Sequence, residues 1–408
     1  MKKLIFFPGN IESSFIQNEL SYYKYYFDEV VVFNYGKEIR NANNVCKNFG
    51  FKYYSMKDAA LVKPCMFFKW LRSYEVWSEL RENFGLSLGS LKKMFYILYY
   101  GYYYIKFEKM IQNEIDSFQG EVYLYSYWLT RTAYTIAKFS NYDSSKIKSI
   151  VSRAHCYDLY LEDNLMNYLP FRKFIEQNLD SIAFISQQGC DYFKKYISVG
   201  GREKFRAKQY VSRLGTFNDR EIYNKGLGKS KIVIASCSSI IPVKRLDLII
   251  EVISKFTRKK VKWIHIGKGI EENKIKRLAK QKLAAGSYKF LGEVKNKNIL
   301  DIYSKYNVDF FINLSDSEGI PVSVMEALSM GIPIIARNIG GISEIVTKDT
   351  GLLLSGKWTK KETKKIVVYI EEMDEKKYRG LSTSCIDKWN KLYNADSNYR
   401  SFFTKMIE

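Results

Sequence analysis

Histidine is nearly absent from this chain, and cysteine is sparse and scattered. The 408 residues include two histidines and six cysteines, and no two cysteines form a CxxC pair. With so few imidazoles, a histidine-based metal centre is disfavoured. The cysteine spacing in a chain of this size favours reduced thiols, a cytosolic location and no cysteine-based metal site. The cysteines occupy positions 46, 65, 156, 190, 237 and 385.

Long hydrophobic runs are also missing. The longest weakly polar stretch, Met94 to Ile105, is rich in tyrosine and falls short of the ~20 apolar residues that a membrane-spanning helix requires. The first ten residues, MKKLIFFPGN, contain an apolar run that is too short for the core of a secretory signal. We therefore expect neither a transmembrane helix nor a leader peptide, and we interpret residues 4–7 as the first buried strand.

Acidic residues are outnumbered by basic ones. There are 65 Lys and Arg against 43 Asp and Glu, which gives a formal net charge of +22. Three anionic partners suit such a surplus: nucleic acid, anionic lipid headgroups and diphosphate substrates. Nucleic acid fits least, because the sequence has no helix-turn-helix, zinc-finger or RNP-like pattern and no long basic tail. An AT-rich genome, whose codons favour lysine, is an alternative cause of part of the charge, so the charge alone assigns no function.

Apolar, β-rich runs alternate with helix-length segments along the whole chain. This pattern predicts an α/β protein with parallel sheets covered by helices on both faces. Because 408 residues are too many for one ordinary core, we expect two Rossmann-like domains. The expected strands are 4–7, 30–33, 122–125, 147–151, 182–185 and 209–211 in the first half, and 232–235, 263–266, 290–291, 308–314, 332–336 and 352–354 in the second.

The boundary between the two expected domains falls in a polar stretch with two glycines, residues 218–230. We assign residues 1–222 to the first domain and residues 223–387 to the second. The remaining C-terminal segment has helical character and carries several aromatic residues, namely Trp389, Tyr393, Tyr399, Phe402 and Phe403.

The stretch from Phe310 to Val346, FFINLSDSEGIPVSVMEALSMGIPIIARNIGGISEIV, is the most informative part of the sequence. It predicts a strand, a loop, a helix, a second strand, a glycine turn and a second helix. Glu318 lies in the loop, and Glu326 follows eight positions later in the helix. Because ligands of open α/β domains bind at the carboxyl ends of the strands, we expect both carboxylates at a ligand-binding rim.

This stretch resembles the signature of glycosyltransferase family 4, whose members are retaining enzymes with the GT-B fold. The resemblance implies two Rossmann-like domains that face each other across a cleft, with a C-terminal helix, here residues 388–408, that crosses back to the first domain. It also implies that Glu326 binds the ribose and Glu318 the sugar of a nucleotide-sugar donor. A carboxylate suits such a role because it accepts hydrogens from two vicinal hydroxyls.

The residues after Glu318 are implied by the same resemblance to bind oxygens of the donor at a helix N-terminus. They are Gly319, Ile320, Pro321 and Val322. Many relatives have glycine where this chain has Pro321. Because proline lacks an N–H, whatever contact that amide makes in the relatives is missing here.

A second motif, SCSSIIPVKRLD, follows the expected strand 232–235. Family members usually have an arginine and, five residues later, a lysine, and both point at the donor diphosphate. Lys244 stands at the lysine position, whereas Ser239 replaces the arginine, and adjacent Arg245 is a candidate substitute. A fixed cation stabilises the charge that grows on the leaving diphosphate in the transition state. Because the start of a helix is an unfavourable place for a cation, we favour a functional role for Lys244 over that of a surface lysine.

His155, in IVSRAHCYDLYLED, follows the expected strand 147–151 and has the polar neighbours Arg153 and Asp158. By resemblance it reaches the donor sugar, which makes it a catalytic candidate together with Glu318 and Lys244. A lone histidine is otherwise more often structural, and we interpret His265, in an apolar context, in that way.

Glycines after other strands complete the expected donor site. Gly9 follows the first strand, where it would either let the donor phosphates approach closely or form a turn. Gly267 lies in the turn HIGKG, and Gly292 and Val294 lie in a segment that resembles the one receiving the nucleotide base. The last candidates are Gly340, Gly341 and Glu344. They would either close the phosphate side of the donor site or form a turn that packs a helix.

The segment from Leu91 to Met110 mixes tyrosine with lysine. Such a mixture suits a membrane headgroup region or a lipid-linked acceptor. An amphipathic helix packed on the first sheet explains it as well, and we favour that interpretation. Nearby Phe67, Lys69, Trp70 and Trp77 keep an acceptor or membrane role open.

Together these features predict a retaining glycosyltransferase. It would move a hexose from a nucleotide-diphosphate sugar to a glycan or lipid-linked acceptor in bacterial surface polysaccharide synthesis, such as that of capsule or lipopolysaccharide. We expect a cytoplasmic protein with peripheral contact to the anionic inner face of the membrane, no nucleic-acid partner, no cofactor and no metal. Two alternatives remain, a nucleotide-sugar epimerase of the GT-B fold and a non-catalytic nucleotide-sugar-binding subunit. Few histidines disfavour the first, whereas Ser239 would permit the second.

Overall fold

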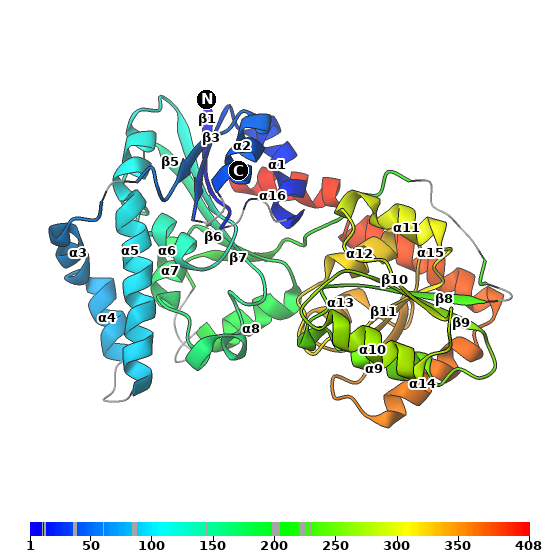
Figure 1. The fold of residues 1–408 in the computed structure, drawn as a ribbon. Helices are drawn as coiled ribbons and strands as arrows, with labels where there is room; N and C mark the ends of the chain where they lie inside the picture. The colour runs from blue at the N-terminus through cyan, green and yellow to red at the C-terminus, as the bar shows by residue number, and fades with distance from the viewer. Residues whose placement is uncertain are drawn as a thin grey trace. The chain divides into compact units, whose positions relative to one another are not determined.

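The chain forms two compact units, Met1–Ser212 with Tyr399–Glu408, and Arg213–Asn398. The computed structural model describes residues 1–9, 11, 14–35, 39–59, 61–83, 88–143, 145–197, 205–220, 226–228 and 231–408. The expected domain boundary at residues 222 and 223 lies outside these ranges. Figure 1 shows the elements of each unit.

The first unit is built on a seven-stranded parallel sheet with the strand order β3-β2-β1-β4-β5-β6-β7. Its strands are β1 (Lys2–Phe7), β2 (Glu29–Asn34), β3 (Lys52–Ser55), β4 (Glu121–Ser126), β5 (Ile147–Ala154), β6 (Ser181–Phe184) and β7 (Lys208–Val211). Its helices are α1 (Ser14–Tyr26), α2 (Ile39–Phe49), α3 (Pro64–Leu71), α4 (Tyr74–Asn83), α5 (Leu88–Asp116), α6 (Arg131–Ala137), α7 (Arg172–Asn178), α8 (Gln187–Ile197) and most of α16 (Ala395–Ile407), with 3₁₀ turns at Leu161–Asp163 and Leu165–Asn167.

Alternating side chains of β1 explain why helices cover both faces of this sheet. Successive residues of a strand point to opposite faces. Phe6 stacks on Tyr125 and meets Tyr23 of α1, whereas Phe7 stacks on Phe33 on the other face, where α5 packs. Both faces are therefore apolar, and β1 is buried on both sides, as a central parallel strand requires.

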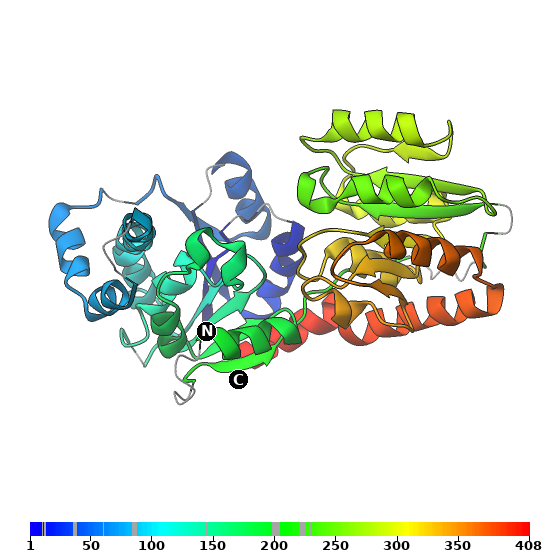
Figure 2. The same ribbon diagram turned by 90° about the horizontal axis from the view of Figure 1, so that it is seen from below.

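The second unit has a six-stranded parallel sheet with the order β10-β9-β8-β11-β12-β13. Its strands are β8 (Ile232–Cys237), β9 (Val261–Ile266), β10 (Tyr288–Phe290), β11 (Phe310–Asn313), β12 (Ile334–Arg337) and β13 (Gly351–Leu354). Helix α9 packs on α10 and α14, and α12 packs on α11 and α15. In Figure 1, α9 and α10 lie below the strands and α11 and α12 above them, so helices cover both faces, and Figure 2 shows the same unit from below. These helices are α9 (Leu246–Ile253), α10 (Glu272–Lys282), α11 (Ile299–Lys305), α12 (Val322–Ser329), α13 (Ile342–Ile345), α14 (Lys360–Glu371) and α15 (Glu375–Leu392), with 3₁₀ turns η3 (Pro242–Lys244) and η4 (Asn296–Asn298).

Every strand expected from the sequence is present, and β3 is the one that was missed. Its sequence, KYYS, is short and only one of its four side chains is buried, because it lies at the edge of the sheet. The favoured interpretation of residues 91–110 agrees with α5, which contributes Ile97, Tyr104 and Phe107 to the core of the first unit. Within the described part of the chain, no helix is both long and apolar enough to span a membrane.

Helix α16 begins in the second unit, and its residues from Tyr399 onward belong to the first. Phe403 is fully buried, and its ring lies 5.3 Å from that of Tyr23 and 5.4 Å from that of Tyr26. The guanidinium of Arg153 lies 4.1 Å from the ring centre of Phe402. Aromatic packing of this kind makes the end of the chain a part of the first core.

Replacing Phe403 with alanine should remove about 3 kcal/mol of stability from the first unit, because it leaves a cavity in a close-packed aromatic cluster. Hydrogen–deuterium exchange of the full chain measures this separately for each unit. We expect faster exchange in β1 and unchanged exchange in β8. The matched control is Phe68→Ala, since Phe68 is exposed on α3. Equal loss of protection in both strands would contradict the assignment of the end of α16 to the first unit.

Candidate active site

The side chains of the second unit with the strongest sequence signal gather at the carboxyl ends of its central strands. Turn η3 follows β8, and the loop that carries Glu318 follows β11 and leads into α12. Strands β8 and β11 are neighbours in the sheet, so the segments that follow them share one edge. This is the edge at which ligands of parallel sheets bind.

Lys244 and Glu318 form an ion pair at this edge. The Lys244 ammonium donates a hydrogen bond of 2.7 Å to Oε1 of Glu318, and both side chains are largely shielded from solvent. Asn313, the last residue of β11, donates to the same oxygen at 3.1 Å. The structure therefore brings two of the three predicted catalytic residues into contact. Oε2 of Glu318 takes no part in either bond.

Glu326 is buried in α12, where its side chain is 5% exposed. Its carboxylate accepts a hydrogen bond of 2.6 Å from Asn296 in η4, the turn before α11. Burial raises the pKa of Glu326 to about 7, although the Asn296 amide acts in the opposite direction. A buried carboxylate with one polar partner is suited to accept further hydrogen bonds from a ligand that carries hydroxyls.

Arg245 is engaged with carboxylates. It bonds Asp247 at 3.0 and 3.1 Å and Asp316 at 3.2 and 3.3 Å, and Asp316 also pairs with Arg337. These carboxylates raise the pKa of Arg245 above its ordinary range. Ser239 is exposed on the preceding loop and supplies no charge. The cation that this motif offers without competition from Asp247 or Asp316 is therefore Lys244.

Two glycines are required by close contact between backbones. At Gly267 (φ +135°) a Cβ would lie 1.9 Å from the carbonyl oxygen of Ser238, and at Gly340 (φ +53°) it would lie 1.8 Å from that of Glu318. Gly340 thus lets the turn after β12 pack directly on the loop that carries Glu318. Glu344, in the helix that follows, pairs with Arg213 at 2.8 Å. These contacts favour the helix-packing explanation of Gly340.

The segment between β10 and η4 lies along the end of β9. The Leu291 amide donates to His265 at 2.8 Å, and the Gly267 amide donates to Gly292 at 2.8 Å. Val294 follows and is half-buried. These bonds hold the proposed base-binding backbone beside the turn at Gly267. His265 itself is buried, and its Nδ1 lies 2.9 Å from the Ser236 hydroxyl, which is a structural setting.

Helix α12 begins at Val322, with Pro321 as its N-cap residue. Ile320 is buried beside Gly341, so this residue offers a ligand its backbone and not its side chain. The amides of the first helical turn have no carbonyl within the helix to bond. Gly319 and Val322 are half-buried at the same end of the helix. The predicted anion-binding amides are thus at a helix N-terminus, with Pro321 contributing none.

In the first unit, Gly9 and His155 meet through Trp128. A Cβ on Gly9 (φ +78°) would lie 2.9 Å from the indole, and the imidazole of His155 lies 4.2 Å from it, centre to centre. Trp128 follows β4, Gly9 follows β1 and His155 follows β5, so all three lie at the carboxyl edge of this sheet. The two predicted residues are therefore brought together by a tryptophan that sequence reasoning did not select.

His155 is buried, and neither ring nitrogen has a hydrogen-bond partner among the described residues. Its Nδ1 lies 3.6 Å from Asp158, which is too long for a hydrogen bond. Burial lowers the pKa of His155, and Asp158 acts in the opposite direction. A neutral imidazole with unpaired nitrogens is ready to bond a hydroxyl of a ligand.

Sequence reasoning also missed Asn296, Asn313 and Lys268. Asn313 ends an apolar run, FFIN, and a polar residue at a strand end was the signal that could have identified it. Asn296 reaches Glu326 from a position 30 residues away, and nothing local marks it. Lys268, between Gly267 and Gly269, is exposed, and its Cε lies 3.3 Å from the place that a Cβ on Gly292 would take.

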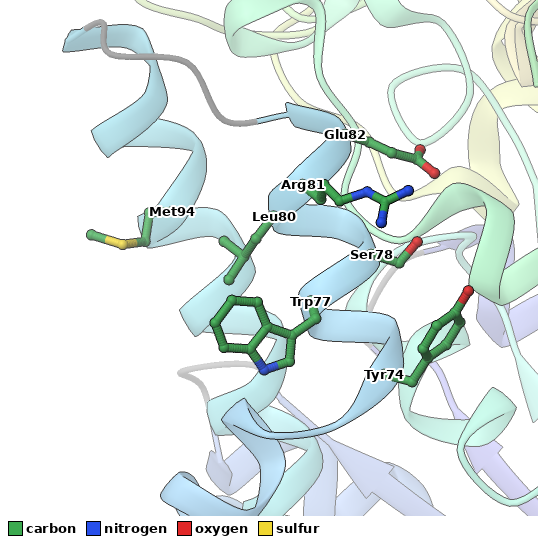
Figure 3. A pocket seen from close by; sticks show the side chains of 7 residues that line it. All are labelled: Tyr74, Trp77, Ser78, Leu80, Arg81, Glu82 and Met94. Atoms are coloured by element: carbon green, nitrogen blue, oxygen red, sulfur yellow. The ribbon is translucent and has the colours of Figure 1, made fainter.

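A pocket of about 710 Å³ lies on the first unit, and its lining includes Trp77 but none of the predicted catalytic or donor-binding residues. Trp77 and Leu80 extend from α4 toward α5, whereas Tyr74, Arg81 and Glu82 extend from the other side of α4 (Figure 3). Ser78 and Met94 complete its lining. The pocket therefore belongs to the α4–α5 pair and is separate from the strand ends described above.

Comparison with known proteins finds similarity in the second unit. Residues 218–383 match the family described as Glycosyl transferases group 1. The O-antigen biosynthesis glycosyltransferase WbnH of Escherichia coli is 37% identical over 111 residues, which are 27% of this chain and 30% of that protein. The chain thus spans less than a third of that relative.

Solved structures match over the whole length. The chain superimposes on Anabaena Alr3699/HepE in complex with UDP with a TM-score of 0.66 and 15% identity, and on the lipopolysaccharide outer core galactosyltransferase WaaB with 0.67 and 14%. Each match covers 100% of this chain and 99% of the other. The chain has the GT-B fold of these structures, and residues 218–383 of its second unit are similar to the group 1 glycosyl transferases.

Proposed function

We propose that this protein transfers a hexose from a nucleotide-diphosphate sugar to an acceptor hydroxyl with retention of configuration. The observation that carries the proposal is the contact between Lys244 and Glu318 at the carboxyl ends of β8 and β11. A cation for a diphosphate and a carboxylate for sugar hydroxyls stand side by side there. The UDP bound in the Anabaena structure, which has the same fold, supports a nucleotide-diphosphate donor.

The donor would be held by groups of opposite charge. Glu326 would accept hydrogens from the ribose hydroxyls, and the backbone at Gly292 and Val294 would receive the base. Lys244 and the amides at Gly319 and Val322 would bind the diphosphate, since a helix N-terminus favours anions. A diphosphate on Lys244 would release Glu318 from its ion pair, and Glu318 would then bind the sugar.

In the transfer step, the acceptor oxygen forms a bond to the anomeric carbon, and the bond from that carbon to the diphosphate oxygen breaks. The acceptor hydroxyl gives its proton to a diphosphate oxygen, so the nucleoside diphosphate leaves with both the electron pair and the proton. Lys244 stabilises the charge on the leaving oxygens, which is where fixed positive charge lowers the barrier most. This scheme uses side-chain cations and backbone amides in place of a metal or cofactor.

We place the reaction in bacterial surface polysaccharide synthesis, on a glycan or a lipid-linked acceptor held by the first unit. The O-antigen role of the Escherichia coli relative supports this setting. The net charge of +22 supports peripheral contact with the anionic inner face of the membrane.

A non-catalytic donor-binding subunit is the second candidate, and Ser239 at the usual arginine position favours it. Lys268 argues against it, because this exposed lysine lies beside the Ser239 loop, where the Ile240 amide donates to the Lys268 carbonyl at 2.9 Å. It supplies a cation that the motif alone lacks. Release of nucleotide from the donor separates the two candidates, since an inactive subunit binds without releasing it.

Glu326→Gln should stabilise the free protein at pH 8 and weaken donor binding. A buried carboxyl with a pKa of about 7 binds a proton in the folded state between pH 4.5 and 7, so stability falls as the pH rises through this window. Above pH 7, ionisation of the buried carboxyl lowers the free energy of unfolding by on the order of 3 kcal/mol, and glutamine removes this loss. Loss of charge-assisted bonds to the ribose should weaken binding roughly 10- to 100-fold.

Calorimetric titration with UDP-, GDP- and ADP-sugars between pH 5.5 and 8.5 measures the binding part, and hydrogen exchange of β11 and β12 measures the stability part. The affinity of the unsubstituted protein for the donor should rise with pH, because the ribose hydroxyls bond the ionised carboxylate more strongly than the neutral acid. The control Glu372→Gln removes an exposed carboxyl at the end of α14 and should change neither quantity. Unchanged affinity in Glu326→Gln would refute the ribose assignment.

Lys244→Ala should slow nucleotide release roughly 100-fold or more, with a smaller effect on donor affinity, because the cation acts mainly on charge that develops in the transition state. Release is followed by chromatography with whichever donor binds in the titrations. Lys360→Ala, which removes an exposed lysine from α14, is the matched control. A rate equal to that of the parent would exclude Lys244 as the leaving-group cation.

A further inference from the structure

Arg131 of the first unit is a cation held by aromatic rings. Its guanidinium carbon lies 4.8, 5.2 and 5.6 Å from the ring centres of Tyr103, Tyr99 and Tyr35. Two of these tyrosines are on α5, and the third follows β2. Neutral rings attract a cation without cancelling its charge. The rings therefore fix the position of Arg131 and leave its positive charge available.

Arg131 has no counterion among the described carboxylates, and its buried Nε has no hydrogen-bond partner there. A half-buried guanidinium in this state gains most from an anion that can bond it with two oxygens. Phosphate has that geometry. Arg131 begins α6, directly after β4, so it stands at the carboxyl edge of the sheet, three residues from Trp128.

Tyr157 provides a link between Arg131 and the strand-end residues. Its ring lies 4.7 Å from that of Trp128 and is half exposed. Burial and Asp158 raise the pKa of Tyr157 while Arg131 lowers it, so the guanidinium lies within electrostatic reach of this ring. Exposed aromatic rings of this kind are suited to stack on a sugar, which would lie next to a phosphate on Arg131.

An exposed apolar stripe runs along α5 and reaches the tyrosines that hold Arg131. It consists of Leu91, Phe95, Tyr99 and Tyr102, which are 50, 68, 44 and 40% exposed. Their spacing puts them on one face of the helix, within about 80° of one another at 3.6 residues per turn. From Leu91 to Tyr103 the helix rises roughly 18 Å. Tyr99 belongs both to the stripe and to the group around Arg131.

Packing does not account for this stripe. The core of the first unit takes other residues of α5, such as Ile97 and Phe107. A contiguous exposed apolar surface of this kind marks a place where an apolar ligand or partner binds. Met94, which lines the pocket of Figure 3, is on the same helix and lies between Leu91 and Phe95 in the sequence.

We propose that the acceptor is a glycan joined through a phosphate to a lipid chain. The phosphate binds Arg131, the hydrocarbon lies along Leu91, Phe95, Tyr99 and Tyr102, and its end reaches the pocket beside Trp77 and Met94. The inference rests on the proposed function and narrows its acceptor to this one class. A free glycan would use neither the uncompensated cation nor the apolar stripe.

The test uses dodecyl phosphate below its micelle-forming concentration, inorganic phosphate and UDP-glucose, each titrated by calorimetry into the full chain. Dodecyl phosphate should bind at least 10-fold more tightly than inorganic phosphate. Arg131→Gln should weaken the binding of dodecyl phosphate roughly 10- to 100-fold, because charge-assisted hydrogen bonds are lost. Arg131→Lys keeps the charge and should restore part of the affinity.

Phe95→Ser should weaken the binding of dodecyl phosphate several-fold and leave the affinity for inorganic phosphate unchanged. The control Lys109→Gln removes an equal charge from an exposed site on α5 and should change neither affinity. Equal binding of dodecyl phosphate by Arg131→Gln and the parent would overturn the proposal. So would a Phe95→Ser variant that loses only its binding to phosphatidylglycerol vesicles, because the stripe would then dock on a membrane.

Titration of UDP-glucose or the donor found by screening keeps the two proposals apart. We expect every first-unit variant to bind the donor as the parent does, since the donor residues lie in the second unit. Failure of the unsubstituted protein to bind any nucleotide sugar would refute the proposed function, while the dodecyl phosphate titrations would still report on Arg131.

Discussion

The candidate site depends on one geometric constraint of parallel sheets, which is that neighbouring strands end at the same edge. Lys244 and Glu318 are 74 positions apart in the chain, and they form a 2.7 Å ion pair because they follow the adjacent strands β8 and β11. Asn313 fixes the carboxylate from the strand end itself. Under the proposed function, the charges for a diphosphate and for a sugar would be in place before a ligand arrives, and the ion pair neutralises both in the free protein.

Close backbone contact holds this arrangement in place. Gly340 lets the turn after β12 touch the carbonyl of Glu318, and Gly267 lets the turn after β9 touch that of Ser238. A side chain at either position would separate the loops. Burial of Glu326 lowers the stability of the free protein near neutral pH. With a pKa of about 7, this carboxyl is partly protonated when no ligand bonds it. Stability and donor binding are therefore expected to respond to pH in opposite directions.

The first unit shows the same principle with different chemistry. Gly9, Trp128 and His155 follow three different strands and meet at one edge, and Arg131 stands close by among tyrosines. This edge is aromatic and cationic, whereas that of the second unit combines carboxylates with a lysine. The contrast fits a division in which the second unit binds the donor and the first binds the acceptor. The exposed face of α5 extends the first edge into an apolar surface.

The sequence by itself determined the α/β class and all strands but the edge strand β3, and it singled out Glu318, Glu326 and Lys244 as candidate site residues, because hydrophobic periodicity and a long motif are local properties. It also identified residues 91–110 as a helix packed on the first sheet. Only the tertiary structure decided that Arg245 is engaged by Asp247 and Asp316, that Asn296 bonds Glu326, and that Trp128 joins Gly9 to His155. Those contacts join residues through folded loops, and no pattern along the chain encodes which side chains meet when separate strands end at one edge.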